Sequence, residues 1–122
     1  MVSPHNEFLA YVLETMSHIG IVTSRRMFGG YGLYREGVMF ALIAEDTLYL
    51  KADANNVMRF EQAGSLPFTY ESAGCKVQLS YWSAPADCLE SAAEMCDWCQ
   101  LAYAAALRAQ AAKPATSTRK KK

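Results

Sequence analysis

The sequence has little of what catalytic and metal sites are usually built from. Its only two histidines, His5 and His18, flank one predicted helix near the N-terminus. They cannot complete a Ser-His-Asp arrangement, and no strand-turn segment resembles a nucleophile elbow. Because a metal site needs several ligands, each histidine is interpreted as a surface or terminal residue. We therefore expect a protein that is not an enzyme and uses no cofactor.

Long apolar runs are also missing. No stretch approaches the roughly 20 apolar residues of a membrane-spanning helix. The N-terminal segment lacks the basic stretch and apolar core of a signal peptide. We expect a cytoplasmic protein that makes no membrane contact. Its four cysteines are then expected to be reduced thiols.

The sequence has no net charge, since twelve basic residues balance twelve acidic ones. Five of the basic residues lie in 113–122, which leaves residues 1–112 with a balance of −5. An acidic body repels a phosphate backbone over most of its surface. The length fits one domain over 1–112. The segment KPATSTRKKK has no apolar period, so 113–122 is predicted to be a basic disordered tail.

Three antiparallel strands form the densest fold signal. They are predicted over residues 31–34, 38–44 and 47–52, with short turns between them. The segment 21–28 is predicted to run extended towards the glycines that precede the first strand. These glycines, GGYG at 29–32, lack the layout of a phosphate-binding loop. They are interpreted as positions where the backbone approaches another segment closely.

The flanking segments complete the order α-β-β-β-α-β-β-α. A helical stripe over 4–19 predicts the first helix, and Asp53 is a candidate cap for a short helix over 54–63. Two strands are predicted over 68–72 and 75–82, followed by a long helix that ends near residue 112. We expect an α+β fold with a mainly antiparallel five-stranded sheet and helices packed on one face.

Cys96-Asp97-Trp98-Cys99 has the spacing of a redox or zinc motif. Redox sites of this type lie at a helix N-terminus that follows a strand, whereas Cys96 is predicted a turn inside its helix. Together with Cys75 and Cys88, the spacing matches no zinc finger or ribbon. The pair is interpreted as small buried thiols. A small-ligand or thiol-redox role stays open as a weaker alternative.

The segment 38–44 is apolar on both faces, although a half-exposed strand should alternate. Either both sheet faces are covered within the monomer, or the second face meets another chain. Aromatic-rich exposed patches commonly mark interaction sites. The candidate interaction residues lie on or beside the predicted meander: Arg25, Arg26, Phe28, Tyr31, Tyr34, Met39 and Tyr49.

Arg25-Arg26 is the only basic doublet in 1–112. An exposed pair beside an aromatic residue would be able to hold phosphate or an acidic partner. A surface pair that balances the acidic body is the commoner outcome. With the basic tail, the doublet supports an alternative function in which the protein binds nucleic acid directly.

A family resemblance runs through the same region. It rests on RMFGGYG at 26–32, the turn at Gly37, MFALI at 39–43 and LYLK at 48–51, with later support from FTY at 68–70, YW at 81–82 and Trp98. In these segments the chain resembles the N-terminal domain of the TfoX/Sxy family of bacterial competence regulators. The resemblance covers roughly residues 5–110.

The resemblance implies a bacterial, cytosolic protein with an α/β fold of the type that secretion chaperones also use. Better-known members act as transcriptional co-regulators of DNA-uptake genes, together with the cyclic-AMP receptor protein. Those members carry a second, C-terminal domain, whereas this sequence ends after the first. No catalytic residues are implied. We expect a noncatalytic interaction domain that regulates transcription through protein contacts or self-associates through its sheet.

Overall fold

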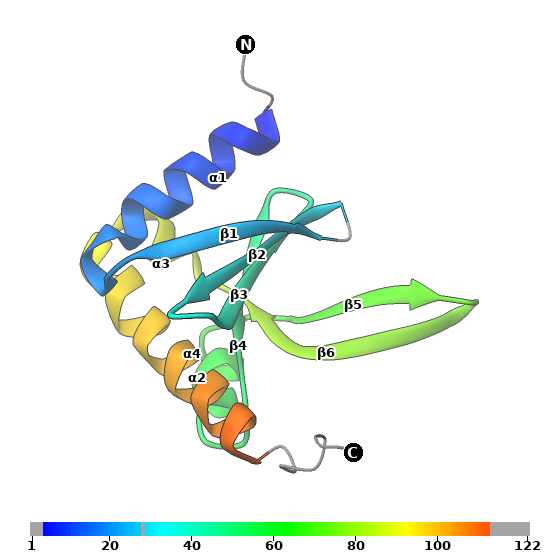
Figure 1. The fold of residues 1–122 in the computed structure, drawn as a ribbon. Helices are drawn as coiled ribbons and strands as arrows, with labels where there is room; N and C mark the ends of the chain where they lie inside the picture. The colour runs from blue at the N-terminus through cyan, green and yellow to red at the C-terminus, as the bar shows by residue number, and fades with distance from the viewer. Residues whose placement is uncertain (1–3, 28, 113–122) are drawn as a thin grey trace, which may run out of the picture.

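A computed structural model of the chain describes residues 4–27 and 29–112 (Figure 1). The predicted tail over 113–122 lies outside these residues. In chain order the elements are α1 (Pro4–Thr15), η1 (Met16–Ile19), β1 (Val22–Met27), β2 (Gly30–Arg35), β3 (Val38–Ala44), β4 (Thr47–Lys51), α2 (Val57–Gln62), β5 (Pro67–Ser72), β6 (Cys75–Ser83), α3 (Ala86–Glu90) and α4 (Ala92–Ala112).

The strands form one antiparallel sheet in the order β1-β2-β3-β4-β6-β5. The predicted α+β class and the meander are confirmed, but the predicted count of five strands is wrong. The segment expected only to run extended is β1, which pairs with β2 from Val22↔Arg35 to Met27↔Gly30. The residues of β1 are mostly polar and show no apolar alternation. Its strand structure therefore depends on pairing with β2 rather than on a pattern in its own sequence.

The helices gather on one side of the sheet, while the β5–β6 hairpin extends away from them (Figure 1). The long helix α4 packs on β3, where the Tyr103 ring meets the Phe40 ring edge-on at 6.1 Å between centroids. Met16 of η1 and Met95 of α4 are fully buried in the same core. The predicted packing of helices on one face is confirmed. Within the described residues, no helix has the length and apolar character needed to cross a membrane.

A register shift accounts for part of the continuous apolar sequence of β3. Leu33 pairs with Ala41 and Tyr34 pairs with Met39, so β3 contributes one extra residue between the two pairs. This residue is Phe40, and both Phe40 and Ala41 are fully buried in the helix-covered core. A β-bulge of this kind places two consecutive side chains in one layer. Strict alternation is therefore lost where the strand bends.

The connection from β4 to α2 differs from the prediction. The helix begins at Val57 rather than residue 54, and its N-cap residue Asn56 makes no side-chain capping bond. Asp53 Oδ1 instead accepts hydrogen bonds from the Asn55 and Asn56 backbone N–H groups at 3.0 and 3.2 Å. Asp53 therefore stabilises a turn before the helix. Arg108 of α4 binds the same carboxylate through Nε at 2.7 Å.

Stability should depend on the charge of Asp53 at acid pH. The hydrogen bond from Arg108, aided by the backbone N–H groups, lowers the pKa of Asp53 below 3.8 against the opposing effect of burial. Ionised Asp53 therefore contributes stability above about pH 4 that is lost as pH falls through the depressed folded pKa. The loss should be small because Arg108 is exposed and water screens its attraction to Asp53.

The Asp53→Asn variant keeps the Oδ1 acceptor and removes the charge. Denaturant unfolding of this variant between pH 5 and pH 2 should show a smaller loss of stability than the parent chain. Glu61→Gln, at an exposed carboxylate on α2, is the matched control and should follow the parent. Equal pH dependence in the parent and Asp53→Asn would show that the Arg108 contact contributes nothing.

Candidate functional site

On the sheet face opposite the helices, neighbouring side chains cover Gly32. A Cβ built on Gly32 would lie 2.7 Å from Met27 Sδ, 3.0 Å from Met39 Sδ and 3.2 Å from Tyr34 Cε1. These three side chains, from β1, β3 and β2, therefore converge over the glycine. They fit there because residue 32 has no side chain, which agrees with the interpretation that a glycine here lets another segment approach closely.

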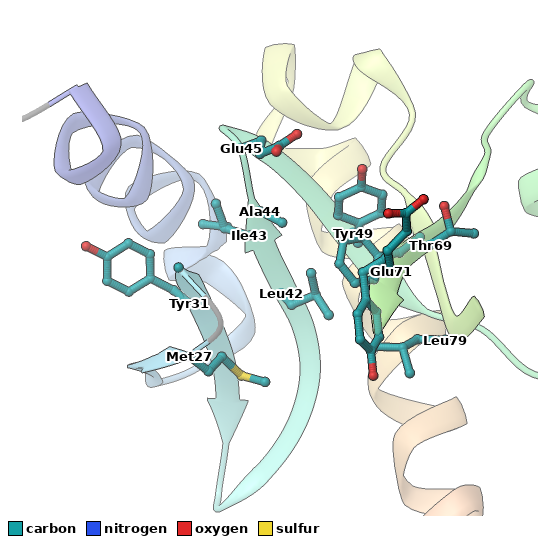
Figure 2. Close-up of a pocket in the computed structure, with 13 residues that line it drawn as sticks. Met27, Tyr31, Leu42, Ile43, Ala44, Glu45, Tyr49, Thr69, Glu71 and Leu79 are labelled. Atoms are coloured by element: carbon teal, nitrogen blue, oxygen red, sulfur yellow. The ribbon is translucent and has the colours of Figure 1, made fainter. Parts of the chain in front are cut away.

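A groove of about 540 Å³ opens beside this cluster. Met27 and Leu42 form one wall, and Tyr49 and Leu79 belong to the other (Figure 2). Phe68 also lines the groove, with its ring beside the Tyr49 ring. The first wall comes from β1 and β3, and the second from β4 and the β5–β6 hairpin. The volume falls in the range of sites that bind small molecules or a few side chains.

Aromatic rings follow one another along the hairpin wall. The Tyr49 and Phe68 rings meet at 4.9 Å between centroids with an interplanar angle of 64°. Phe68 stacks on Tyr70 at 6.1 Å, and Tyr70 is 39 % exposed. Burial, and to a smaller extent the charge of Glu45, raises the pKa of Tyr49. The aromatic part of this wall is therefore partly solvent-accessible, and the Tyr49 hydroxyl is protonated at physiological pH.

The groove side chains explain why the segment 38–44 is apolar on the face opposite the helices as well. Leu42 lies on this face as the cross-strand partner of Tyr49, and it is only 5 % exposed. The monomer itself therefore covers Leu42, through the side chains that form the groove. What stays open is the channel between the two walls rather than a flat sheet surface.

The arginine doublet does not form one patch. Side chains alternate along a strand, so Arg25, opposite Gly32, faces the groove side, while Arg26, opposite Tyr31, faces the helix side. The Arg25 guanidinium lies over the Tyr34 ring at 5.6 Å. Tyr31 lines one end of the groove but its ring points away from it (Figure 2).

The candidate residues are thus only partly brought together. The groove side of the sheet collects four of them: Arg25, Tyr34, Met39 and Tyr49. Arg26 and the Tyr31 ring lie on the other side, and Phe28 lies outside the described residues. The hairpin residues Phe68, Tyr70 and Leu79 were not predicted. The alternation of Phe68 and Tyr70 was the sequence pattern that could have indicated this wall. The position of the hairpin beside β4 became evident only from the fold.

Of Cys96 and Cys99, which were interpreted as small buried thiols, Cys99 is buried as predicted and Cys96 is not fully buried. Cys88 and Cys99 are fully buried, Cys96 is half-buried and Cys75 is exposed. Burial, with smaller effects of Glu94 and Asp87, raises the pKa of Cys88 to about 12. Burial also raises the pKa of Cys99. Among the described residues, no group of histidines, cysteines and carboxylates is arranged to hold a metal ion.

Thiol reactivity should follow this burial. With Ellman's reagent at mild alkaline pH, exposed Cys75 should react first, while Cys88 should react much more slowly because it is buried and its raised pKa leaves little thiolate. Cys99 should also stay protected until the protein unfolds. The Cys75→Ser variant should lose the fast phase alone. Rapid modification of Cys99 in the folded protein would contradict the packing and favour the thiol-redox alternative.

Two comparisons place the chain among known proteins. The profile of a family described as TfoX N-terminal domain matches residues 14–106. A relative named DNA transformation protein TfoX1, from Aliivibrio fischeri (strain ATCC 700601 / ES114), is 36 % identical over 52 residues. That alignment covers 43 % of this chain and 25 % of the relative. The chain therefore spans about a quarter of the relative that it matches.

Proposed function

The chain belongs to the TfoX N-terminal domain family, and from this membership we propose that it is a noncatalytic protein-interaction domain that acts in transcriptional regulation. The observation that carries the proposal is the groove between Leu42 and the aromatic wall of Tyr49 and Phe68. A concave, aromatic and partly exposed surface is suited to receive side chains of another protein. The cytoplasm is the compartment in which such a regulator would act.

Direct nucleic-acid binding has less support from the geometry. Arg25 and Arg26 point to opposite faces of the sheet, so this doublet does not present two guanidinium groups to one phosphate. Residues 1–112 also carry more acidic than basic groups. An interaction with a phosphate backbone would have to overcome that repulsion.

Binding to the cyclic-AMP receptor protein of the same host is the direct test, because the family resemblance implies that partner. We expect Phe68→Ala to weaken the complex about tenfold or more in isothermal titration calorimetry, since it removes an aromatic group from the centre of the wall. Met58→Ala is the matched control, because Met58 lies on α2 and is 63 % exposed. It should bind like the parent chain.

Circular dichroism would first show that both variants are folded. Equal binding by Phe68→Ala, Met58→Ala and the parent would rule out the groove as the contact surface. Binding to a DNA duplex that falls steeply with salt, and is unchanged by Phe68→Ala, would favour the nucleic-acid alternative.

A further inference from the structure

Two carboxylates belong to the lining of the groove. Glu45 follows β3 in the turn to β4, and Glu71 lies on β5 (Figure 2). The described lining residues include no lysine, arginine or histidine. Neither carboxylate forms an ion pair within the described part of the chain, although Lys76 is the cross-strand partner of Glu71. The groove therefore combines an apolar centre with two carboxylates that form no ion pair among the described residues.

The turn that holds Glu45 is unusual among the hairpin turns of this protein. Glu45 and Asp46 have φ of 51° and 58°, whereas the second turn residue elsewhere is Gly37 or Gly74. A turn with positive φ at both central residues usually places glycine second. The β3–β4 turn instead carries two acidic residues in left-handed conformations. Asp46 therefore takes the position that glycine occupies in the β2–β3 and β5–β6 turns, and it follows Glu45 directly in the sequence.

The aromatic wall supports the same preference for a cation. Lysine and arginine side chains are attracted to the faces of tyrosine and phenylalanine rings. The sheet already shows such pairs further from the β3–β4 turn, where Arg25 lies over Tyr34 at 5.6 Å and Lys51 over Tyr81 at 5.1 Å. Arg25 and Lys51 thus each lie over a tyrosine ring outside the groove lining, whereas the lining itself contains Glu45 and Glu71.

We infer that the groove binds an extended segment of a partner protein in which an apolar side chain is accompanied by a lysine or arginine. The apolar group would fill the space between Leu42 and Phe68, and the cation would lie beside Glu45 and Glu71. This inference rests on the proposed interaction function and specifies the chemistry of the partner.

The test uses two short fluorescein-labelled peptides and the full chain. One peptide alternates leucine with lysine, and its twin has glutamate in place of every lysine. Fluorescence anisotropy should show that the lysine peptide binds at least about tenfold more tightly than the glutamate peptide. Equal binding of the two peptides would overturn the inference, because the groove would then recognise only the apolar side chains of the peptide.

A pair of double variants separates a local effect from net charge. Glu45→Gln with Glu71→Gln should weaken binding of the lysine peptide about fivefold, as rim charges typically have modest effects. Glu61→Gln with Glu90→Gln changes the charge equally at exposed sites on α2 and α3. This control should bind like the parent. An equal loss in both double variants would overturn the inference in favour of long-range attraction.

The remaining outcomes distinguish this inference from the proposed function. If the peptides do not discriminate but Phe68→Ala still weakens the partner complex, the charge preference is wrong and the interaction function stands. If Phe68→Ala has no effect on that complex, the proposed function fails. A concentration-dependent dimer in analytical ultracentrifugation that Phe68→Ala disrupts would make a second copy of the chain the occupant, and would overturn the inference.

Discussion

Replacing Gly30 by alanine is expected to lower the free energy of unfolding by about 3 kcal/mol, the upper part of the range for overpacking. A Cβ on Gly30 would lie 1.9 Å from the Ile43 carbonyl oxygen and 3.3 Å from Ala44 Cα. Both atoms belong to the backbone of β3, which is hydrogen-bonded on both sides. They cannot move aside as a side chain would. Relief would require β2 and β3 to separate, at a cost in buried core.

The matched control is Gly37→Ala. Gly37 has a φ of +81° and an added Cβ would meet nothing within 4 Å, so this variant should lose only about 1 kcal/mol through backbone strain. Urea unfolding followed by circular dichroism measures both. If the loss at Gly30 were no larger than the loss at Gly37, the close approach of β2 to β3 would be wrong.

Local signals explain which elements could be predicted. The long helix α4 begins after Ser91, whose Oγ accepts a hydrogen bond from the Glu94 N–H at 3.3 Å, and Met95 and Cys99 are buried along its stripe. Both the helix cap and the apolar stripe are formed by residues that are close together in the sequence. The strands of the meander were equally evident, because short turns join them directly.

The strand and the site residues that the sequence did not predict depend on tertiary contacts. Strand β1 has no apolar period, and its structure depends on pairing with β2. The groove depends on the pairing of β6 with β4, which places Tyr49 opposite Ser83 and brings Phe68 to Tyr49. No local pattern predicts a contact between segments that are separated by a helix. Met39 of β3 and Tyr49 of β4 were therefore predicted as candidates, while the hairpin residues beside Tyr49 were not.

Replacing Asn56 by leucine is expected to lower the free energy of unfolding by about 3 kcal/mol, because buried polar groups would lose their partners. Asn56 is 1 % exposed. Its Nδ2 donates to the carbonyl oxygens of Lys51 and Leu101, each at 3.2 Å, and its Oδ1 accepts from the Asp53 N–H at 2.8 Å. The side chain thus joins β4, the following turn and α4.

Asn55→Leu provides the matched control, because Asn55 is exposed and its hydrogen bond to Asp53 Oδ1 uses the backbone N–H, which leucine retains. Thermal and urea unfolding of the two variants should separate them by most of the expected 3 kcal/mol, since a lone exposed change is usually worth under about 0.5 kcal/mol. A similar small loss in both would mean that water or relaxed backbone replaces the three bonds of Asn56. The attachment of α4 to the end of β4 would then rest on apolar contacts and on the Asp53–Arg108 pair alone, and removing that pair should loosen the helix.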